Sequence, residues 1–428
     1  MPYTYTYGSG TENDPYQVWD ADDLNGVRDH LDKYFIQMAD IDLISYQNDS
    51  WSVGVGNDWT ERTDGVGWLP IGDKDNPFIG KYDGDGFKIG NLKIVSSYGV
   101  WQDIGLFGRL AGWGEITGLN LTNVYLKTTG ERTSAVGSIV GWCAGGHITH
   151  SKVQCEIHAN PTVASNALAG GVLGGTSTSW EEEVILNNLT VAADVHGTAS
   201  RVGGISGYVY FTDGVYTNNK VTGKVVGTGL VGGFYAGITF AVSNIEISKH
   251  FGDIEIEANS STVGGFAGQT VPGFNVVGTS INKSCTKGEL NGGQGSEIGG
   301  FVGYNSRTKF NNCYSRVNLS NINANDVGGF VGANWTNGEV NNCYSTGIVS
   351  GTTGSNWGGL IGRLASGAVT NSYYDSTLSG QSDTGKGVPK TTAEMTYPYS
   401  DPENVYINWA FYGEDPDPVW AHDKGGSA

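Results

Sequence analysis

The chain has 428 residues, a net charge of −19, 68 glycines and only 11 prolines. Such acidity repels phosphate backbones and anionic lipid surfaces, which argues against nucleic-acid binding, and no apolar run approaches the length of about 18 residues that suits a membrane span. Aromatic residues make up 11% of the chain, too many for a disordered glycine-rich linker, so the composition favours short strands joined by tight turns.

The first predicted element is a short helix at Asp20–Leu31, with the sequence DADDLNGVRDHL. Asp20 suits the N-cap, and Asp22 and Asp23 suit the first turn because they meet the positive end of the helix dipole. The opening MPYTYTYGSG has neither a basic region nor an apolar run, so we expect no signal peptide. We predict that residues 1–95 form an N-terminal cap and the first irregular coils of a stack, since the exposed edge of a stack needs a cover.

The central part of the chain repeats a Gly-Gly-apolar-apolar-Gly phrase nine times, with small departures. Successive copies are 29 to 35 residues apart, and their last positions are Gly108, Gly141, Gly174, Gly207, Ala236, Gly268, Gly303, Gly332 and Gly362. Each copy contains two or three runs typical of short strands, and none has helical periodicity. We therefore predict an all-β chain in which each copy forms one coil, stacked about 4.8 Å from the next.

The second half of the copies carries asparagine at a recurring position, which we predict to form a structural ladder of amides at a buried turn. Its members are Asn188, Asn218, Asn244, Asn312, Asn342 and Asn371. The following position is predicted to point inward, and it holds Leu119, Leu189, Ile245, Cys313 and Cys343. The glycine pairs are expected to form corners that need either a positive φ or a close approach of two backbones.

Several of these phrases resemble the GLUG motif, among them GLFG at Gly105–Gly108 and GGFVG at Gly299–Gly303 and Gly328–Gly332. Three further segments resemble the flanking parts of such proteins: Gly8–Leu43, Trp68–Ile94 and Ser372–Met395. The resemblance implies a right-handed parallel β-helix of about nine or more coils with one short N-terminal capping helix. Residues 96–380 would form the β-helix and residues 381–428 a C-terminal cap.

The resemblance also limits the expected functions, because the family is a scaffold without shared catalytic residues. It occurs in bacterial and archaeal surface adhesins, in stalks of large secreted peptidases and in phage or prophage tail proteins. Without a signal peptide, we favour a non-enzymatic virion tail fibre, spike or receptor-binding protein that contacts a host surface glycan or protein. Its further partners would be other virion proteins or two more copies in a homotrimer. The alternatives are a secreted cell-surface adhesin and a purely structural particle or stalk protein.

Outward aromatic side chains are the candidate ligand-binding residues, because aromatic rings stack on sugar rings. They are Trp113, Trp142, Trp180, Tyr208, Tyr210, Tyr304 and Trp335. Packing between loops and contacts between subunits explain such a set equally well.

A tailspike-type enzyme that cuts polysaccharide, as a glycoside hydrolase or a lyase, is the catalytic alternative. It would need paired carboxylates, for which the candidates are Glu181, Glu182, Glu183, Asp253, Glu255 and Glu257. The last three alternate along one predicted strand, so they should face the same side, where a solvated acidic surface is the simpler interpretation.

No cofactor or metal site is expected from the remaining motifs. Asp83 and Asp85 have the spacing of a calcium loop, but the later Glu of such a loop is absent, and two tight Asp-Gly turns are the simpler explanation. GQSDTGKG at Gly380–Gly387 ends in Gly where a phosphate-binding loop needs Ser or Thr, so we interpret it as a polar loop.

Overall fold

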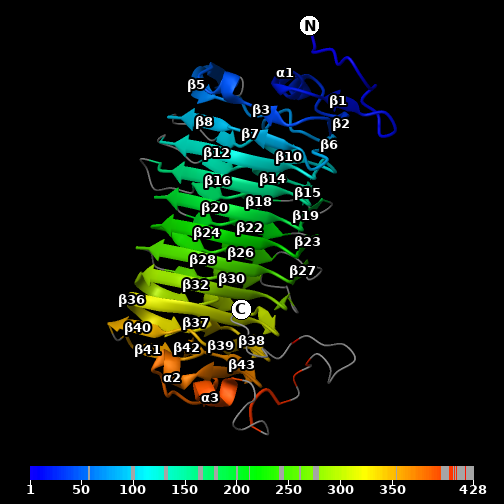
Figure 1. Cartoon of the computed structure of the whole chain (residues 1–428). Coiled ribbons are helices and arrows are strands. Elements are labelled where there is room, and N and C mark those ends of the chain that lie inside the picture. Colours follow the sequence, from blue (N-terminus) through cyan, green and yellow to red (C-terminus); the bar gives the residue numbers. More distant parts are fainter. Residues whose placement is uncertain are drawn as a thin grey trace.

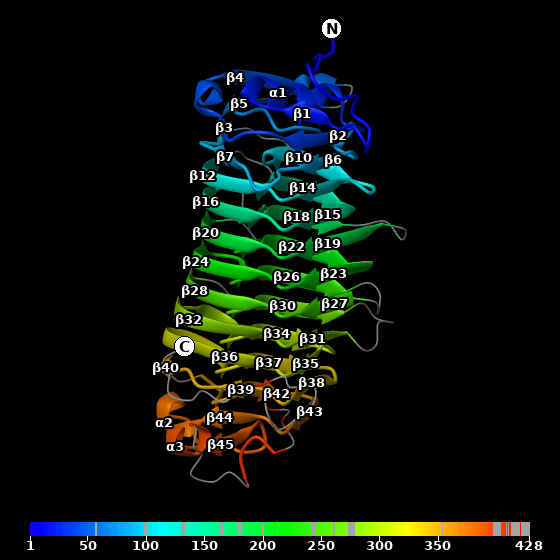
Figure 2. The same ribbon diagram turned by 45° about the vertical axis from the view of Figure 1, so that its right-hand side comes forward.

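The structure is a computed structural model that describes residues 1–55, 58–97, 102–129, 134–161, 167–177, 182–198, 201–211, 213–240, 245–259, 262–272, 279–352, 354–396, 404–407, 409, 411 and 420. Within these residues the short strands stack coil upon coil along one axis, with the N-terminal end at the top of Figure 1. Figure 2 shows three columns of strands that run the length of the stack. The predicted all-β fold is confirmed, and it is a parallel β-solenoid.

One sheet has nine strands, one from each copy of the repeat. They are β10 (Phe107–Ala111), β14 (Val140–Ala144), β18 (Leu173–Ser177), β22 (Ser206–Phe211), β26 (Tyr235–Phe240), β30 (Ala267–Pro272), β34 (Val302–Ser306), β37 (Val331–Trp335) and β42 (Ile361–Leu364). Equivalent positions of the repeat pair in parallel, as Val140 with Leu173 and Val302 with Val331. The register of the sheet therefore follows the repeated phrase.

A second sheet has 12 strands and begins with the N-terminal segment. They are β1 (Tyr16–Val18), β2 (Tyr34–Gln37), β6 (Lys81–Asp83), β11 (Glu115–Thr117), β15 (Gly146–Thr149), β19 (Glu183–Asn187), β23 (Asp213–Thr217), β27 (Ile245–Ser248), β31 (Ser280–Asn282), β35 (Lys309–Asn311), β38 (Gly338–Asn341) and β43 (Gly367–Thr370). Parallel stacking thus begins well before the first copy of the repeat.

The third sheet has 24 strands. Those before the glycine corner, with their N- and C-terminal neighbours, are β3 (Ile41–Asp42), β7 (Lys88–Gly90), β8 (Lys93–Ser96), β12 (Asn120–Thr128), β16 (Lys152–Ala159), β20 (Thr190–Gly197), β24 (Lys220–Gly227), β28 (Phe251–Ala258), β32 (Cys285–Gly292), β36 (Tyr314–Gly328), β39 (Tyr344–Ser345), β40 (Val349–Thr352), β44 (Tyr373–Asp375) and β45 (Val388–Lys390). Short strands that lead into the corner are β9 (Gln102–Ile104), β13 (Ser134–Gly137), β17 (Leu168–Gly170), β21 (Arg201–Gly203), β25 (Leu230–Gly232), β29 (Thr262–Gly264), β33 (Gln294–Gly299) and β41 (Asn356–Gly358). Near the N-terminus β4 (Ser50–Val55) pairs antiparallel with β5 (Asp58–Gly67), which pairs antiparallel with β8.

The predicted asparagine ladder lies at the corner that follows the 12-stranded sheet. Its described members Asn188, Asn218, Asn312, Asn342 and Asn371 have φ between 46 and 57°, a conformation that asparagine tolerates better than most residues. Asn218 Nδ2 donates to Asn188 Oδ1, and Asn342 Nδ2 donates to Asn312 Oδ1 at 3.4 Å. The side chains are exposed or half-buried, so the ladder lies on the surface and the prediction of a buried turn is wrong.

One coil departs from the predicted ladder. Asn244 and the side chain of Ile245 lie outside the described residues, and the corner of that coil is Lys249, with a φ of 58°. The inward position is then His250, which is 1% exposed. In the neighbouring coils this inward slot holds apolar Leu189 and Cys313, but also polar Asn219 and Ser284, all buried.

The glycine pairs form the other corner through close backbone approach. None of Gly299, Gly300 and Gly303 has a positive φ. A Cβ on Gly300 would lie 2.2 Å from the carbonyl oxygen of Gly329, and a Cβ on Gly303 would lie 2.6 Å from that of Val263. Of the two reasons predicted for these glycines, close approach is therefore the one that applies.

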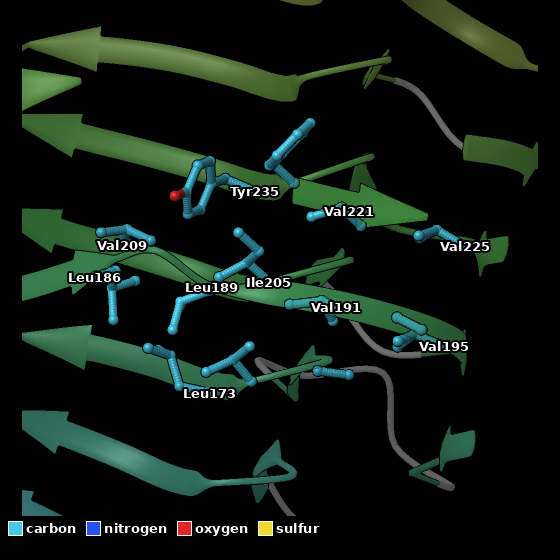
Figure 3. Close-up of a cluster of buried hydrophobic side chains, with 14 of the residues drawn as sticks. Leu173, Leu186, Leu189, Val191, Val195, Ile205, Val209, Val221, Val225 and Tyr235 are labelled. Carbon is cyan, nitrogen blue, oxygen red and sulfur yellow. The ribbon is translucent and has the colours of Figure 1, made fainter. Parts of the chain in front are cut away.

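The apolar residue after each glycine pair points into the core. Leu106, Ile139, Val172, Ile205, Phe234, Phe266, Phe301, Phe330 and Leu360 occupy this position, and all are fully buried. Figure 3 shows part of this core, where Ile205 lies near Leu189 and Val191 of the segment that forms β20. The main hydrophobic cluster runs from Tyr5 to Tyr374, so the coils share one continuous core.

A buried amide ladder that was not predicted from the sequence lies inside the C-terminal coils, on β34 and β37. Asn305 Nδ2 donates to Asn334 Oδ1 at 2.7 Å, and Asn305 Oδ1 accepts from Thr270 Oγ1 at 2.8 Å. Asn334 Nδ2 donates to the carbonyl of Gly338 at 2.9 Å. Both amides are fully buried, and these hydrogen bonds offset the cost of removing them from water.

Short helices lie toward both ends of the stack. The predicted N-terminal helix is confirmed as α1 (Ala21–Gly26) continued by the 3₁₀ turn η1 (Val27–Asp29), and Asp20 caps it by accepting from the amides of Asp22 and Asp23. A second 3₁₀ turn, η2, spans Ile44–Tyr46. Two further short helices, α2 (Ser376–Ser379) and α3 (Thr392–Met395), follow the last coil and were not predicted from the sequence. Thr391 and Glu394 form a capping box for α3, a sequence signal that the analysis overlooked.

Candidate functional site

The outer face of the nine-stranded sheet gathers most of the described aromatic candidates. Successive residues of a strand face opposite sides, so on β22 Val209 is buried in the core while Tyr208 and Tyr210 face outward. Paired positions along the sheet form one outward column, here called the aromatic column: Arg109, Trp142, Gly175, Tyr208, Gly237, Gln269, Tyr304, Ala333 and Arg363. Three candidates, Trp142, Tyr208 and Tyr304, therefore share one line along the axis.

The other candidates lie elsewhere. Tyr210 and Trp335 belong to an outward column two residues further along the same sheet. Trp113 lies in the turn between β10 and β11, is 63% exposed and meets His147 edge-on at 6.3 Å between ring centroids. Trp180 lies outside the described residues. The structure thus joins five candidates on one face and separates Trp113 from them.

A second outward column faces the aromatic column across the glycine corner. It comes from the short strands of the 24-stranded sheet and consists of Asp103, Ala135, Leu168, Arg201, Leu230, Thr262, Glu297, Asp326 and Asn356, here called the corner column. Side chains of the two columns touch, as Arg109 Nε lies 3.3 Å from Asp103 Oδ2. The Leu168 side chain covers Gly175, on which a Cβ would lie 2.7 Å from Leu168 Cδ1. Residues about seven positions apart in sequence thereby form one surface.

Three arginines stack on aromatic rings of this surface. The guanidinium carbon lies 4.1 Å from the ring centroid for Arg201 over Tyr208, 4.2 Å for Arg363 over Trp335 and 5.7 Å for Arg109 over Trp142. Each pair combines a cation with the negative face of a ring. These arginines were not predicted from the sequence, although the short distance of Arg201 and Arg363 from the glycine pairs was a usable signal.

Tyr208 lies along the sheet rather than projecting from it. Its hydroxyl donates to Thr239 Oγ1 at 3.2 Å, in the next coil, and a Cβ on the intervening Gly237 would lie 3.4 Å from its Cδ2. The small residue therefore leaves room for the ring to cross the neighbouring strand. Burial also raises the pKa of Tyr304 in the same column.

The proposed catalytic clusters lie on two different sheets. Glu183 begins β19 of the 12-stranded sheet with Glu182 just before it, and Glu181 lies outside the described residues. Asp253, Glu255 and Glu257 face one side of β28 in the 24-stranded sheet, as their alternation predicts. Asp253 pairs with Lys287 at 3.1 Å, while Lys224 lies 3.1 Å from Glu255 and 2.6 Å from Glu257. The hydrogen bond from Lys224 lowers the pKa of Glu257, so this face resembles a solvated network of ion pairs.

A different carboxylate pair, missed in the sequence, lies in the corner column. Glu297 and Asp326 are register partners in adjacent coils, and both precede the glycine pair of their copy by two residues. Glu297 Oε2 accepts from Thr262 Oγ1 at 2.8 Å, and Asp326 Oδ1 accepts from Asn356 Nδ2 at 2.7 Å. Burial, and then the charge of Asp326, raise the pKa of Glu297. The acidic residue that begins both EIGGFVG and DVGGFVG could have predicted this pair from the sequence.

The calcium candidates are engaged in turn geometry. Asp83 Oδ1 accepts from the amide of Asp85 at 2.8 Å, and Asp85 has a φ of 46°. Within the described ranges, no three His, Cys, Asp or Glu side chains are grouped so that they could hold a metal ion. All five cysteines are buried and free.

Comparison with known proteins finds a family match for one segment of the repeat region. Residues 323–350 match the family model of the GLUG motif, as expected from the sequence. A protein of Evansella cellulosilytica, provisionally named a Gly-rich membrane protein, is 33% identical over 136 residues, which are 31% of this chain and 14% of that protein. Halomucin of Haloquadratum walsbyi is 31% identical over 175 residues, 40% of this chain and 2% of that protein. The chain thus spans only a small part of these relatives.

Among solved structures, the chain is similar to one from Bacteroides ovatus that is provisionally named an immunoglobulin A1 protease. The similarity covers 91% of this chain and 88% of that one, with a TM-score of 0.41 and 18% identity. In the part of the chain that the structure describes, no helix is long and apolar enough to cross a membrane.

Proposed function

Starting from a solenoid built of GLUG repeats, we propose that the protein is a non-enzymatic adhesin displayed at a surface. It would contact a glycan or protein of another surface through the outer face of the nine-stranded sheet. The observation that carries the proposal is the alignment of Trp142, Tyr208 and Tyr304 in one outward column. A line of half-buried rings on a rigid rod suits an extended ligand, because each ring offers apolar area at little cost in conformational entropy.

The relatives support display at a surface. One is provisionally named a membrane protein and the other is named halomucin, and neither name refers to a virus. The narrower hypothesis of a virion tail fibre or spike therefore stays a prediction, which mass spectrometry of purified particles from the source culture would test. Trimerisation also stays a prediction, and light scattering of the purified chain would measure it.

The adhesin proposal is tested by retention of purified protein on candidate cell envelopes. Replacing Trp142, Tyr208 and Tyr304 by alanine, singly and together, should reduce retention, with the largest loss in the triple variant. Trp113→Ala removes a more exposed ring that lies off the column and serves as the matched control. Equal retention of the triple variant and the wild type would contradict the proposal.

A depolymerase is the second candidate, because Glu297 and Asp326 are adjacent carboxylates close to Tyr304. A glycoside hydrolase needs one protonated and one ionised carboxyl group, and the raised pKa of Glu297 suits the acid. The test is release of reducing ends from the retained envelopes. New ends that disappear in Glu297→Gln would support the enzyme, whereas retention without new ends would support the adhesin.

A further inference from the structure

The three arginines stacked on rings differ in their partners. Arg109 faces Asp103 with an N–O distance of 3.3 Å, and Arg363 faces Asp326 at 3.9 Å. Arg201 has no carboxylate within ion-pair distance among the residues that the structure describes. As far as the described residues go, no carboxylate occupies its side-chain N–H groups, which can donate to an acceptor outside the chain.

Arg201 is surrounded by apolar and small residues. Its neighbours in the corner column are Leu168, which is 3% exposed, and Leu230. Tyr208, beneath the guanidinium, is flanked by Gly175 and Gly237. No side chain at these four positions competes for the guanidinium, and stacking on the ring restricts its rotamers before a ligand arrives.

We propose that Arg201, held flat by Tyr208, binds the carboxylate of an acidic sugar unit of the uronic acid type. This inference rests on the proposed function, because the sugar would belong to the glycan that the nine-stranded sheet contacts. A guanidinium donates two parallel N–H bonds to a carboxylate, and the half-buried Leu230 would face the apolar side of the sugar ring.

A glycan fits this site better than an acidic protein does. Trp142 lies two coils from Tyr208 in the same column, about 10 Å away at the spacing of stacked strands. Rings repeated along a line suit a polymer of rings, and a short acidic peptide would use only the cation. The net charge of −19 repels polyanions at long range, so binding of an acidic glycan has to come from local contacts that outweigh this repulsion.

The experiment is calorimetric titration of the full chain with hyaluronan, alginate and polygalacturonate oligosaccharides. Each is compared with the same oligosaccharide after reduction of its carboxylates to alcohols. The wild type should bind at least one acidic form about tenfold more tightly than its reduced form, the expected effect of one charge-assisted contact. Arg201→Ala should abolish this preference. Arg201→Lys should retain only part of it, because an ammonium keeps the charge but cannot bind a carboxylate in bidentate fashion.

Lys152→Ala is the matched control, since it removes one positive charge from an exposed position of the 24-stranded sheet. It should keep the full preference, and unchanged melting temperatures would show that all variants fold. The inference is overturned if no oligosaccharide shows a carboxylate-dependent preference, if Arg201→Ala behaves like Lys152→Ala, or if polyglutamate binds as tightly through Arg201. In any of these cases, retention on envelopes that depends on the aromatic column would still support the adhesin, so the two failures are distinguishable.

Discussion

At the residue scale, the same slot of the coil accepts chemically different side chains. The position after the asparagine corner holds leucine, cysteine, serine, asparagine and, at His250, a fully buried imidazole. His250 packs against both Phe234 and Phe266, each with a centroid distance of 5.4 Å, and the backbone N–H of Asn219 donates to its Nδ1 at 3.4 Å. This position is therefore always buried, but it does not require one residue type.

His250 should make the protein sensitive to acid. Burial lowers its pKa to about 3, whereas the imidazole of the unfolded chain has a pKa of about 6.5. The neutral form therefore contributes stability that is complete above pH 6.5 or so and is lost as the pH falls toward 3. We expect the melting temperature of His250→Phe to fall less between pH 7 and pH 4 than that of the wild type. Parallel declines in both proteins would contradict this explanation.

At the element scale, the phenylalanine of GGF forms a stack that runs through the core. The ring centroids of Phe266 and Phe301 are 4.8 Å apart, and those of Phe301 and Phe330 are 4.7 Å apart, with interplanar angles of 7° and 8°. This spacing matches the distance between coils, so each ring rests on the next. The repeated phrase thus specifies a continuous column of aromatic contacts.

Truncating the central ring should be costly. Phe301→Ala should lower the free energy of unfolding by about 3–5 kcal/mol, because it removes contacts to both neighbours and leaves a cavity. Phe301→Leu keeps most of the volume and should cost less than about 1.5 kcal/mol. Urea unfolding followed by circular dichroism measures both. Similar losses for the two variants would show that the core collapses around the gap.

The loop GQSDTGKG supplies hydrogen bonds where the stack ends. In regular coils the second glycine of the pair donates to the next coil, as Gly300 N does to the carbonyl of Gly328 at 3.1 Å. The last such amide, Gly359 N, donates instead to Asp383 Oδ1 at 2.9 Å. Lys386 Nζ donates to the carbonyls of Gly362 at 2.6 Å and Trp357 at 3.1 Å. These side chains replace part of an absent coil.

Removing the hydrogen bonds of Lys386 should destabilise the C-terminal end of the stack and leave its middle unchanged. Lys386→Met keeps the apolar stem and removes the donors for two carbonyls. We expect faster amide hydrogen exchange in β41 and β42 and unchanged exchange in β20 to β26, because solenoid coils contact only their neighbours. Faster exchange throughout the stack would instead show that the coils unfold as one unit.

At the scale of the whole molecule, the stack shields every cysteine from solvent. All five are buried and free, and burial raises the pKa values of the Cys143 and Cys155 thiols to about 12. Since the thiolate is the reactive form, the native protein should react with less than one equivalent of a thiol reagent at pH 8. The denatured chain should react with five equivalents. Rapid reaction of the native protein would mean that coils open readily.

The prediction of the fold succeeded where coils repeat and weakened where they vary. The Asp20 cap is a local pattern that the structure confirms, and Leu119, Leu189, Cys313 and Cys343 are buried at the inward position as predicted. The ladder position of the coil containing Asn244 was taken from sequence spacing, although a variable loop precedes it and Lys249 forms the corner. A longer loop changes the sequence spacing between ladder positions but leaves the pairing register between coils unchanged. Counting residues therefore misplaces the ladder position in such a coil.

The sequence by itself determined the solenoid, because a repeated pattern of inward residues and corners can bury its apolar side only by stacking on its own copies. Only the tertiary structure decided which side chains meet on the outside. Tyr208 and Arg201 come together because the chain turns at the glycine pair, and Glu297 meets Asp326 because hydrogen bonds between coils align them. Those contacts depend on the angle at which the chain turns at the glycine corner and on the hydrogen-bond register between coils. Neither can be derived from the spacing of residues along the chain.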